Sequence, residues 1–199
     1  MRYRAKHQAQ LGAGTPVPGG EQGSRDCGPR SWSVGMDAQT RGRIVPSVDE
    51  ARRRANVRGP QQTNVYDWQR ATLTYTGGPK YKPMRYYIKR RVSEVKQAVR
   101  MGRAVQICIH YGVFNDLMKR TGDPNFRGGH GVTVTDQKTL KNGTVRWLLY
   151  DSLDDKRRAG IPQGWRWVDR DKLVKAMIAF GGSRNSIFAG VFAGGQKKK

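Results

Sequence analysis

The clearest alternation of hydrophobic and polar residues runs from Ala104 to Tyr111 and predicts a β-strand with one buried face. One side of that strand carries Val105, Ile107, Ile109 and Tyr111, and the other carries Gln106, Cys108 and His110. Shorter apolar runs predict further strands at 84–88, 131–135, 145–151, 165–168 and 186–192. An Asn142-Gly143 pair predicts a turn between two of them.

Helices are predicted where apolar residues recur at helical spacing between capping signals. Ser47-Val48-Asp49-Glu50 has the capping-box pattern, and Asp169 can cap a helix whose Leu173, Met177 and Phe180 face inward. The predicted helices cover 27–40, 47–56, 63–73 (with Val65, Trp68 and Leu73 inward), 93–101 and 170–181. Because helices come first and strands follow with a helix packed among them, we expect an α+β fold with a mostly antiparallel sheet.

Length and composition divide the chain into one domain with two appendages. At 199 residues, the chain is long enough to bury one core. Residues 1–23 predict a basic, extended arm rich in glycine and proline, 24–193 a folded domain, and 194–199 a basic tail that ends in Lys197-Lys198-Lys199. We expect the arm to contact other protein subunits of a larger assembly.

The excess of positive charge predicts an anionic partner. Lysine and arginine number 38 against 15 aspartates and glutamates, which gives a formal net charge of +23. Such a charge attracts a polyanion, either nucleic acid or an anionic cell-wall polymer, or the acidic face of a protein. No apolar run is long enough to cross a bilayer, and the N-terminus lacks the apolar region of a signal peptide, so we expect neither feature.

Two cysteines, Cys27 and Cys108, exclude a disulfide framework and a Cys-x-x-Cys zinc site. We expect both thiols to be free, with a Cys27–Cys108 disulfide as the alternative, and we expect no metal or other cofactor. Cys27 stands in Asp26-Cys27-Gly28-Pro29, where Asp26 can cap a helix and Pro29 lacks an N–H that the first turn leaves unpaired. The helix dipole favours a thiolate there, so Cys27 is a candidate nucleophile; a small buried cysteine is the other interpretation.

A cysteine nucleophile needs a base, and the chain offers His7, His110 and His130. His7 lies in the predicted arm, and His110 shares a strand face with Cys108, which also suits a packed core histidine. His130 follows Gly128-Gly129 and opens a strand, which places its imidazole at a sheet edge with room for a substrate beside it. We therefore prefer His130 as the base.

An acidic residue after the next strand can orient His130. If a loop of about 137–144 joins the two strands, Asp151 lies nearly opposite His130 and can accept a hydrogen bond from the imidazole. If Asn142-Gly143 forms a tight two-residue turn instead, the register moves and His130 faces Asp155. Asp154 and Asp155 are therefore the alternative orienting acids, and Asp151 is otherwise the start of an ordinary polar turn.

An Asp-Cys-Gly-Pro start, a Gly-His strand and an aspartate after a following strand, in this order, resemble the papain-like cysteine peptidases, most closely their C39-like, bacteriocin-processing branch. The resemblance covers about 22–192. It implies a papain-like fold in which the helix that carries the nucleophile packs on the sheet. It also implies that Cys27 attacks an amide carbonyl, His130 transfers the proton and Asp151 orients His130.

In that family a glutamine six positions before the cysteine joins the cysteine N–H in the oxyanion hole. Here Glu21 occupies that position and Gln22 stands one residue later. The resemblance therefore implies Gln22 and Cys27 as the oxyanion-hole residues, whereas a glutamate pointing at an oxyanion would repel it.

These features support different functions. We expect a cysteine peptidase or amidase that cleaves peptides or peptidoglycan cross-links as a tail-associated component of a bacteriophage virion. The first alternative is a weak or inactive structural virion protein with the same fold. The second is a nonspecific nucleic-acid-binding protein that uses the cations of Arg52–Arg54 and the aromatic rings of Tyr66, Trp68 and Tyr81. We expect to find the protein in a virion, or otherwise in the cytoplasm.

Overall fold

Helices come first along the chain, and strands with interspersed helices follow. The computed structural model describes residues 27–56, 63–75, 79–119, 125–154 and 164–195. The helices are α1 (Cys27–Thr40), α2 (Val48–Arg54), α3 (Val65–Leu73), α4 (Val92–Arg100), α5 (Tyr111–Met118) and α6 (Arg170–Gly181). The strands are β1 (Arg85–Lys89), β2 (Val105–His110), β3 (Gly129–Thr139), β4 (Val145–Tyr150), β5 (Trp165–Asp169) and β6 (Ala189–Ala193).

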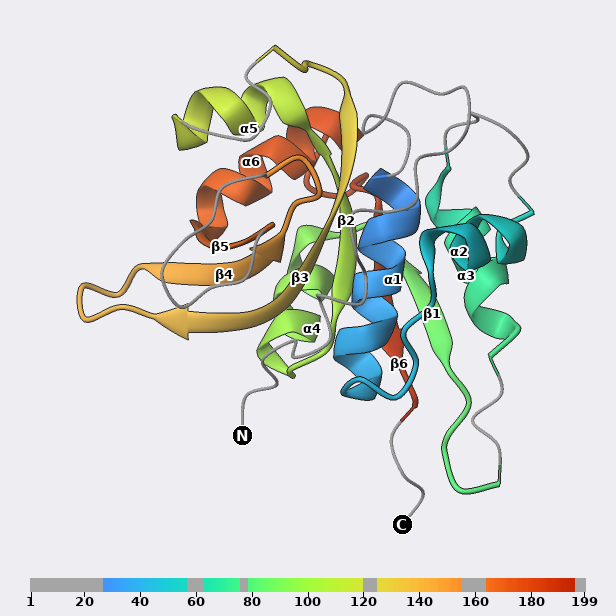
Figure 1. The fold of residues 1–199 in the computed structure, drawn as a ribbon. Helices are drawn as coiled ribbons and strands as arrows, with labels where there is room; N and C mark the ends of the chain where they lie inside the picture. The colour runs from blue at the N-terminus through green and yellow to red at the C-terminus, as the bar shows by residue number, and fades with distance from the viewer. Residues whose placement is uncertain (1–26, 57–62, 76–78, 120–124, 155–163, 196–199) are drawn as a thin grey trace.

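One six-stranded sheet organises these elements. Its strand order is β1-β6-β2-β3-β4-β5, and the neighbouring strands run antiparallel. Helices α1, α2 and α3 cover one face of the sheet, while α4, α5 and α6 pack on the other (Figure 1). The expected α+β class and antiparallel sheet are confirmed.

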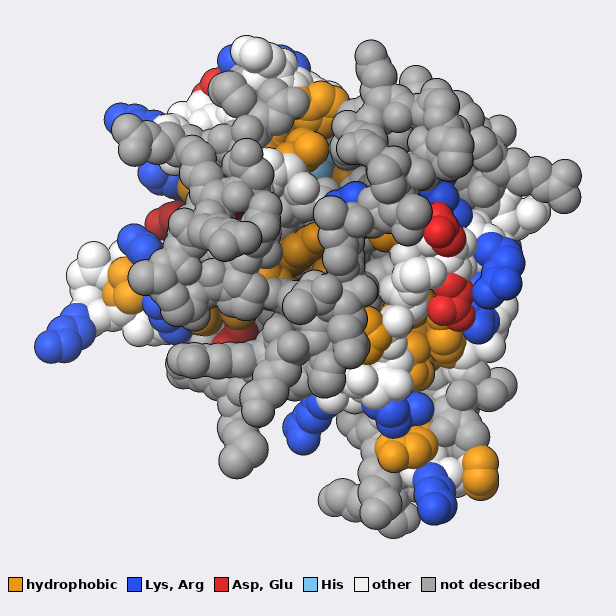
Figure 2. Space-filling model, in the orientation of Figure 1, with side chains coloured by type: hydrophobic (Ala, Val, Ile, Leu, Met, Phe, Trp, Pro, Cys, Tyr) orange, Lys and Arg blue, Asp and Glu red, His pale blue; other side chains and the backbone are white. Residues whose placement is uncertain are grey.

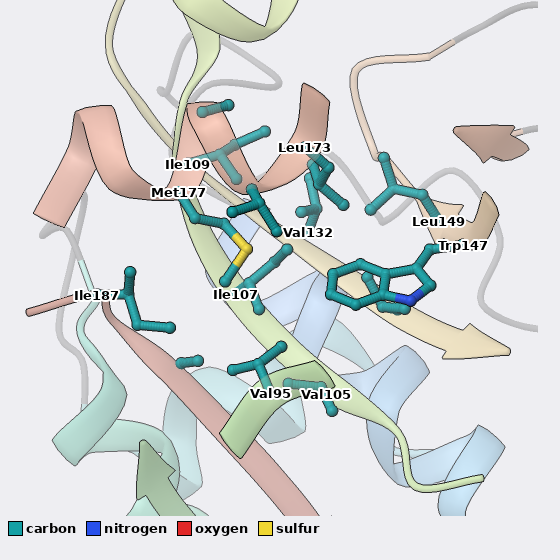
Figure 3. Close-up of a cluster of buried hydrophobic side chains, with 14 of the residues drawn as sticks. Val95, Val105, Ile107, Ile109, Val132, Trp147, Leu149, Leu173, Met177 and Ile187 are labelled. Atoms are coloured by element: carbon teal, nitrogen blue, oxygen red, sulfur yellow. The ribbon is translucent and has the colours of Figure 1, made fainter. Parts of the chain in front are cut away.

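The larger core lies between α4, α6 and one face of the sheet (Figure 3). The alternation predicted for β2 is present, because Val105, Ile107 and Ile109 are fully buried in this core, whereas Cys108 packs on the α1 side. Met177 of α6 completes the contact (Figure 3). Each such side chain contributes about 1.5–3 kcal/mol on burial, so this face holds the sheet and its helices together.

The core on the other face is built around Trp32 of α1. The Trp32 ring stacks on Trp68 of α3 with 5.8 Å between centroids, and its Nε1 donates a hydrogen bond to Thr72 Oγ1 at 2.9 Å. Gly35 lets α1 approach the sheet closely, because a Cβ at this position would meet the ring of Phe192 on β6. The helix that begins at the candidate nucleophile is therefore clamped between α3 and the sheet.

Two residues that the sequence pattern predicted to face the core are exposed, so these two predictions are wrong. Leu73 is 62% exposed because α3 ends there, and Phe180 is 39% exposed in the last turn of α6. Tyr111 does not end the strand but begins α5, a helix that the sequence pattern does not predict. The strand stops at His110 because this residue caps α5: its Nδ1 accepts the Val113 N–H at 3.3 Å.

The β3–β4 hairpin differs from both expected connections. β3 continues to Thr139 and β4 begins at Val145, and the turn between them is closed by a backbone hydrogen bond from Leu140 to Thr144 at 2.9 Å. In addition, the pairing shifts by one residue at a bulge between Val134 and Asp136. The bulge changes how the far ends of the two strands, which carry the candidate site, lie relative to each other.

The predicted arm and the three terminal lysines lie outside the described residues. Gly194 and Gly195, assigned to the tail from the sequence, are hydrogen-bonded to the folded part. The Gly195 N–H donates to the Lys82 carbonyl at 2.9 Å, and Gln39 Nε2 donates to the Gly194 carbonyl at 3.4 Å. Across the described ranges, none of the helices has the length and apolar character that a membrane span requires.

Candidate active site

Cys27 is the first residue of α1, where a helix leaves its backbone N–H groups unpaired. Its thiol is free and half-buried. Burial by itself would raise the pKa of this thiol, but His130 and the backbone N–H groups of Gly131 and Gly28 outweigh it, and the pKa of Cys27 is lowered. The positive end of the helix dipole acts in the same direction. Cys27 is therefore more easily ionised than an ordinary cysteine.

His130 is the second residue of β3, and its side chain is fully buried. Its ring lies edge-on to Tyr111, with 4.7 Å between centroids and 70° between planes. Nε2 lies 2.8 Å from Asp151 Oδ1. Burial lowers the pKa of an imidazole, but Asp151 and Cys27 outweigh it and raise the pKa of His130 to about 9. The ring is therefore an imidazolium at neutral pH.

The Cys27 thiol and the His130 ring attract each other in this arrangement. Because Nε2 is bound to Asp151, Nδ1 is the ring nitrogen left for the sulfur. Nδ1 is buried and makes no hydrogen bond of standard geometry to the described residues, and the two groups attract each other through their opposite charges. Catalytic hydrogen bonds are often long until substrate binds. The lowered pKa of Cys27 and the raised pKa of His130 support a thiolate–imidazolium pair.

Asp151 directly follows β4, and its carboxylate is fully buried. Oδ1 also accepts the Leu153 N–H at 3.0 Å, and Oδ2 accepts the Tyr111 hydroxyl at 3.2 Å and the Arg166 guanidinium at 2.7 Å. Burial would raise the pKa of this carboxyl group, but His130, Arg166 and the Leu153 N–H outweigh it and hold the pKa low. Asp151 is therefore an anion whose Oδ1 orients the imidazole.

Arg166 on β5 belongs to this site, and the sequence analysis missed it. Its guanidinium binds Asp151 and also lies 3.5 Å from Asp154 Oδ2. The structure thus pairs Asp154 with Arg166, not with His130, while Asp155 lies outside the described residues. The sequence does hold one indication of this role, because Arg166 stands between Trp165 and Trp167 in a predicted strand. A cation that is buried in this way requires an acidic partner.

A buried polar network anchors the first turn of α1 to the sheet. Gln106 Nε2 donates to the Gly28 carbonyl at 3.0 Å and to the Ser31 hydroxyl at 2.7 Å, and Gln106 Oε1 accepts the Tyr86 hydroxyl at 2.9 Å. The Thr133 hydroxyl donates to the Ser31 carbonyl at 2.5 Å. These bonds tie the nucleophile end of α1 to β2 and β3, and β3 carries the histidine.

Gly131 allows α1 and β3 to meet. A Cβ at Gly131 would lie 3.2 Å from Ser31 Oγ and 3.4 Å from the carbonyl oxygen of Cys27. The residue opposite Gly131 on β2 is Cys108, and opposed residues share a face of the sheet, so Cys108 lies beside this contact. Burial and the charge of Cys27 raise the pKa of Cys108 to about 12. Both thiols are free, so the alternative disulfide is not formed.

His110, another histidine considered from the sequence, does not join this cluster. His110 is occupied as the cap of α5. His7, Glu21, Gln22 and Asp26 lie outside the described residues, so of the two expected oxyanion-hole residues the structure describes only Cys27. Within the described ranges, no three His, Cys, Asp or Glu side chains are grouped so that they could hold a metal ion.

No protein-family model matches the sequence, and a comparison with curated proteins gives no match.

Proposed function

We propose that this protein is a cysteine peptidase or amide hydrolase of the papain-like type. Cys27 is the nucleophile, His130 carries the proton and Asp151 orients His130. The observation that supports this most directly is the buried His130 ring, which interacts with the Cys27 thiol and lies 2.8 Å from the Asp151 carboxylate. Desolvating three ionisable groups together costs free energy, and groups with shifted pKa values cluster at functional sites.

The reaction divides into two steps. The Cys27 thiolate attacks the carbonyl carbon of an amide, and the Cys27 N–H stabilises the oxyanion that forms. The His130 imidazolium then gives its proton to the leaving amine, and a thioester remains on Cys27. In the second step neutral His130 takes a proton from water, the oxygen of that water attacks the thioester, and the carboxylic acid leaves as the thiolate re-forms.

The papain-like fold and the substrate enter this proposal through the sequence resemblance. Packing of α1 on an antiparallel sheet, with the nucleophile at its N-terminal end, agrees with that fold. The charge of +23 suits an anionic cell wall, which a phage tail component would meet. Among the described residues in Figure 2, Lys and Arg side chains are visible at several separate places on the molecule.

Alkylation with iodoacetamide tests whether Cys27 is activated. At pH 6, where an ordinary thiol is almost fully protonated, we expect rapid modification of Cys27 and none of Cys108, whose pKa is about 12. Cys108→Ala is the matched control and should keep the rapid reaction, whereas Cys27→Ala should lose it. Slow modification of Cys27, at the rate of a free cysteine, would contradict the ion pair.

Release of new amino groups from purified peptidoglycan, and cleavage of a fluorogenic peptide, test the reaction itself. The wild-type protein should hydrolyse one of these substrates, and Cys27→Ala should hydrolyse neither while it keeps the same circular dichroism spectrum. Persistent hydrolysis by Cys27→Ala would refute the assignment of the nucleophile. Rapid alkylation of Cys27 without hydrolysis of either substrate would favour the structural virion protein.

A further inference from the structure

A cavity of about 510 Å³ lies between α4, β3 and the start of α6. The residues that line it all have polar or charged side chains: Ser93, Lys96, Gln97, Arg100, Gln137 and Arg170. Helices α4 and α6 pack on the sheet face that holds the larger core, whereas α1 packs on the other face. We call this cavity the basic cleft; it shares no residue with the candidate active site.

The basic cleft follows from the pattern of α4. Val92, Val95 and Val99 bury one side of this helix against the sheet. Positions 93, 96, 97 and 100 recur at spacings of three and four residues, so their side chains form a second, continuous side. Arg170 is the first residue of α6, directly after its Asp169 cap, and closes the cleft from that side. The fold thus brings cations from separate elements together.

Positive charge exceeds negative charge in the basic cleft. Lys96 Nζ lies 3.5 Å from Asp171 Oδ1, and the Arg170 guanidinium donates to both carboxylate oxygens of Asp171, at 2.9 and 3.1 Å. Arg100 is exposed and has no ion-pair partner in the described part of the chain. The Asp171 side chain is itself 65% exposed, so its ion pairs are weak enough for a bound anion to displace, although they compete with that anion. Such an excess of positive charge attracts multiply charged anions.

We propose that the basic cleft binds a small molecule that carries two adjacent phosphate groups. The planar guanidinium groups of Arg100 and Arg170 match pairs of phosphate oxygens, and the Lys96 ammonium adds a compact charge. The amides of Gln97 and Gln137 supply neutral donors. The cavity is in the range of about 300–1,000 Å³ that is usual for small-molecule sites, and it is too small for a nucleic-acid duplex. This proposal stands whether or not Cys27 hydrolyses amides.

Isothermal titration calorimetry with pyrophosphate, at constant ionic strength, tests the proposal. The wild-type protein should bind one pyrophosphate saturably, and Arg100→Gln should bind it roughly tenfold more weakly because one charge-assisted contact is lost. Arg85→Gln is the matched control, since it removes the same charge from an exposed position on β1, and should leave the affinity unchanged. Asp171→Asn should tighten binding severalfold, because it frees Lys96 and Arg170.

Equal weakening by Arg100→Gln and Arg85→Gln would reduce the effect to general charge attraction and overturn the proposal. Absence of saturable binding, or equal affinity for sulfate and pyrophosphate, would overturn it too. A competition experiment with a single-stranded oligonucleotide tests whether the cleft prefers the phosphates of a small molecule or those of a nucleic-acid backbone. If the oligonucleotide displaces pyrophosphate and Arg100→Gln also lowers the affinity of the protein for the oligonucleotide, the assignment to a small molecule is wrong.

Discussion

Replacing Arg166 with glutamine removes a cation from the buried cluster that holds Asp151 in place. The guanidinium lies 2.7 Å from Asp151 and 3.5 Å from Asp154, and both carboxylate side chains have 0% exposure. Glutamine can still donate a hydrogen bond, but it leaves two buried carboxylates with less compensating charge. The variant should therefore have a lower free energy of unfolding.

The expected loss is about 3–5 kcal/mol, the range for removing one member of a buried ion pair. Coulomb attraction is of the same order, because unit charges about 4 Å apart attract by about 4 kcal/mol at an effective dielectric constant of about 20. An exposed ion pair of similar length provides the comparison. Arg127 lies 2.8 Å from Asp116, with side-chain exposures of 59% and 65%. Losing such a pair costs at most about 1 kcal/mol.

Urea unfolding, followed by far-ultraviolet circular dichroism, measures both losses. At neutral pH, Arg166→Gln should be destabilised several times more than Arg127→Gln. The pKa of Asp151 is lowered in the folded protein, so the stability that its ionised form contributes is present above its unfolded pKa and is lost as the pH falls through the folded value. Because Arg166 contributes to that lowering, the gap between wild type and Arg166→Gln should narrow in acid. Equal losses for the two variants at neutral pH would refute the reasoning.

Three further predictions concern the pH dependence of hydrolysis, the buried side-chain amide of Gln106 and the close contact between Gly35 of α1 and the sheet. His130 must hold a proton for the leaving amine, and its pKa is raised to about 9. We therefore expect kcat/KM to fall as the pH rises through about 9. A fall of kcat/KM near pH 6.5 instead would contradict the ion pair. Gln106→Leu should lower the free energy of unfolding in urea by about 1–3 kcal/mol, because it leaves buried partners unsatisfied. It should also slow iodoacetamide alkylation of Cys27, and an unchanged rate would mean that packing alone positions α1. Gly35→Ala should lower Tm although alanine favours helices by about 1 kcal/mol, because its Cβ meets the Phe192 ring and overpacking costs about 1–3 kcal/mol. A rise in Tm would contradict the close contact.

Elements with local signals could be predicted from the sequence. The helix at 27–40 has its predicted ends, since Pro29 suits a first turn and Arg41-Gly42 adopts the positive φ angles that end a helix. Ser47 accepts the Glu50 N–H and Asp169 accepts the Asp171 and Lys172 N–H groups, as their capping patterns indicate. Such signals lie within a few residues of each other and do not depend on the rest of the fold.

Features that depend on tertiary contacts could not be predicted. The order of Cys27, His130 and Asp151 made them candidates, but their relative placement depends on the bulge next to Val134, which has no local signature. The α5 helix starts immediately after β2. Its first turn contains a glycine and a β-branched valine, and both residues weaken its helical pattern. The site role of Arg166 depends on a strand pairing between β4 and β5 that only the folded chain establishes.

The clamped position of α1 has a consequence for protein synthesis. At translation rates of about 5–20 residues per second, the roughly 100 residues between Cys27 and His130 take about 5–20 s to make. During that interval the thiol has neither the imidazole nor the Gly131 N–H beside it, and its pKa is that of an ordinary cysteine. Phe192, against which Gly35 packs, emerges later still. The nascent chain therefore carries a thiol of ordinary pKa, and the pKa falls only after β3 has been made and has brought His130 and Gly131 beside the first helix.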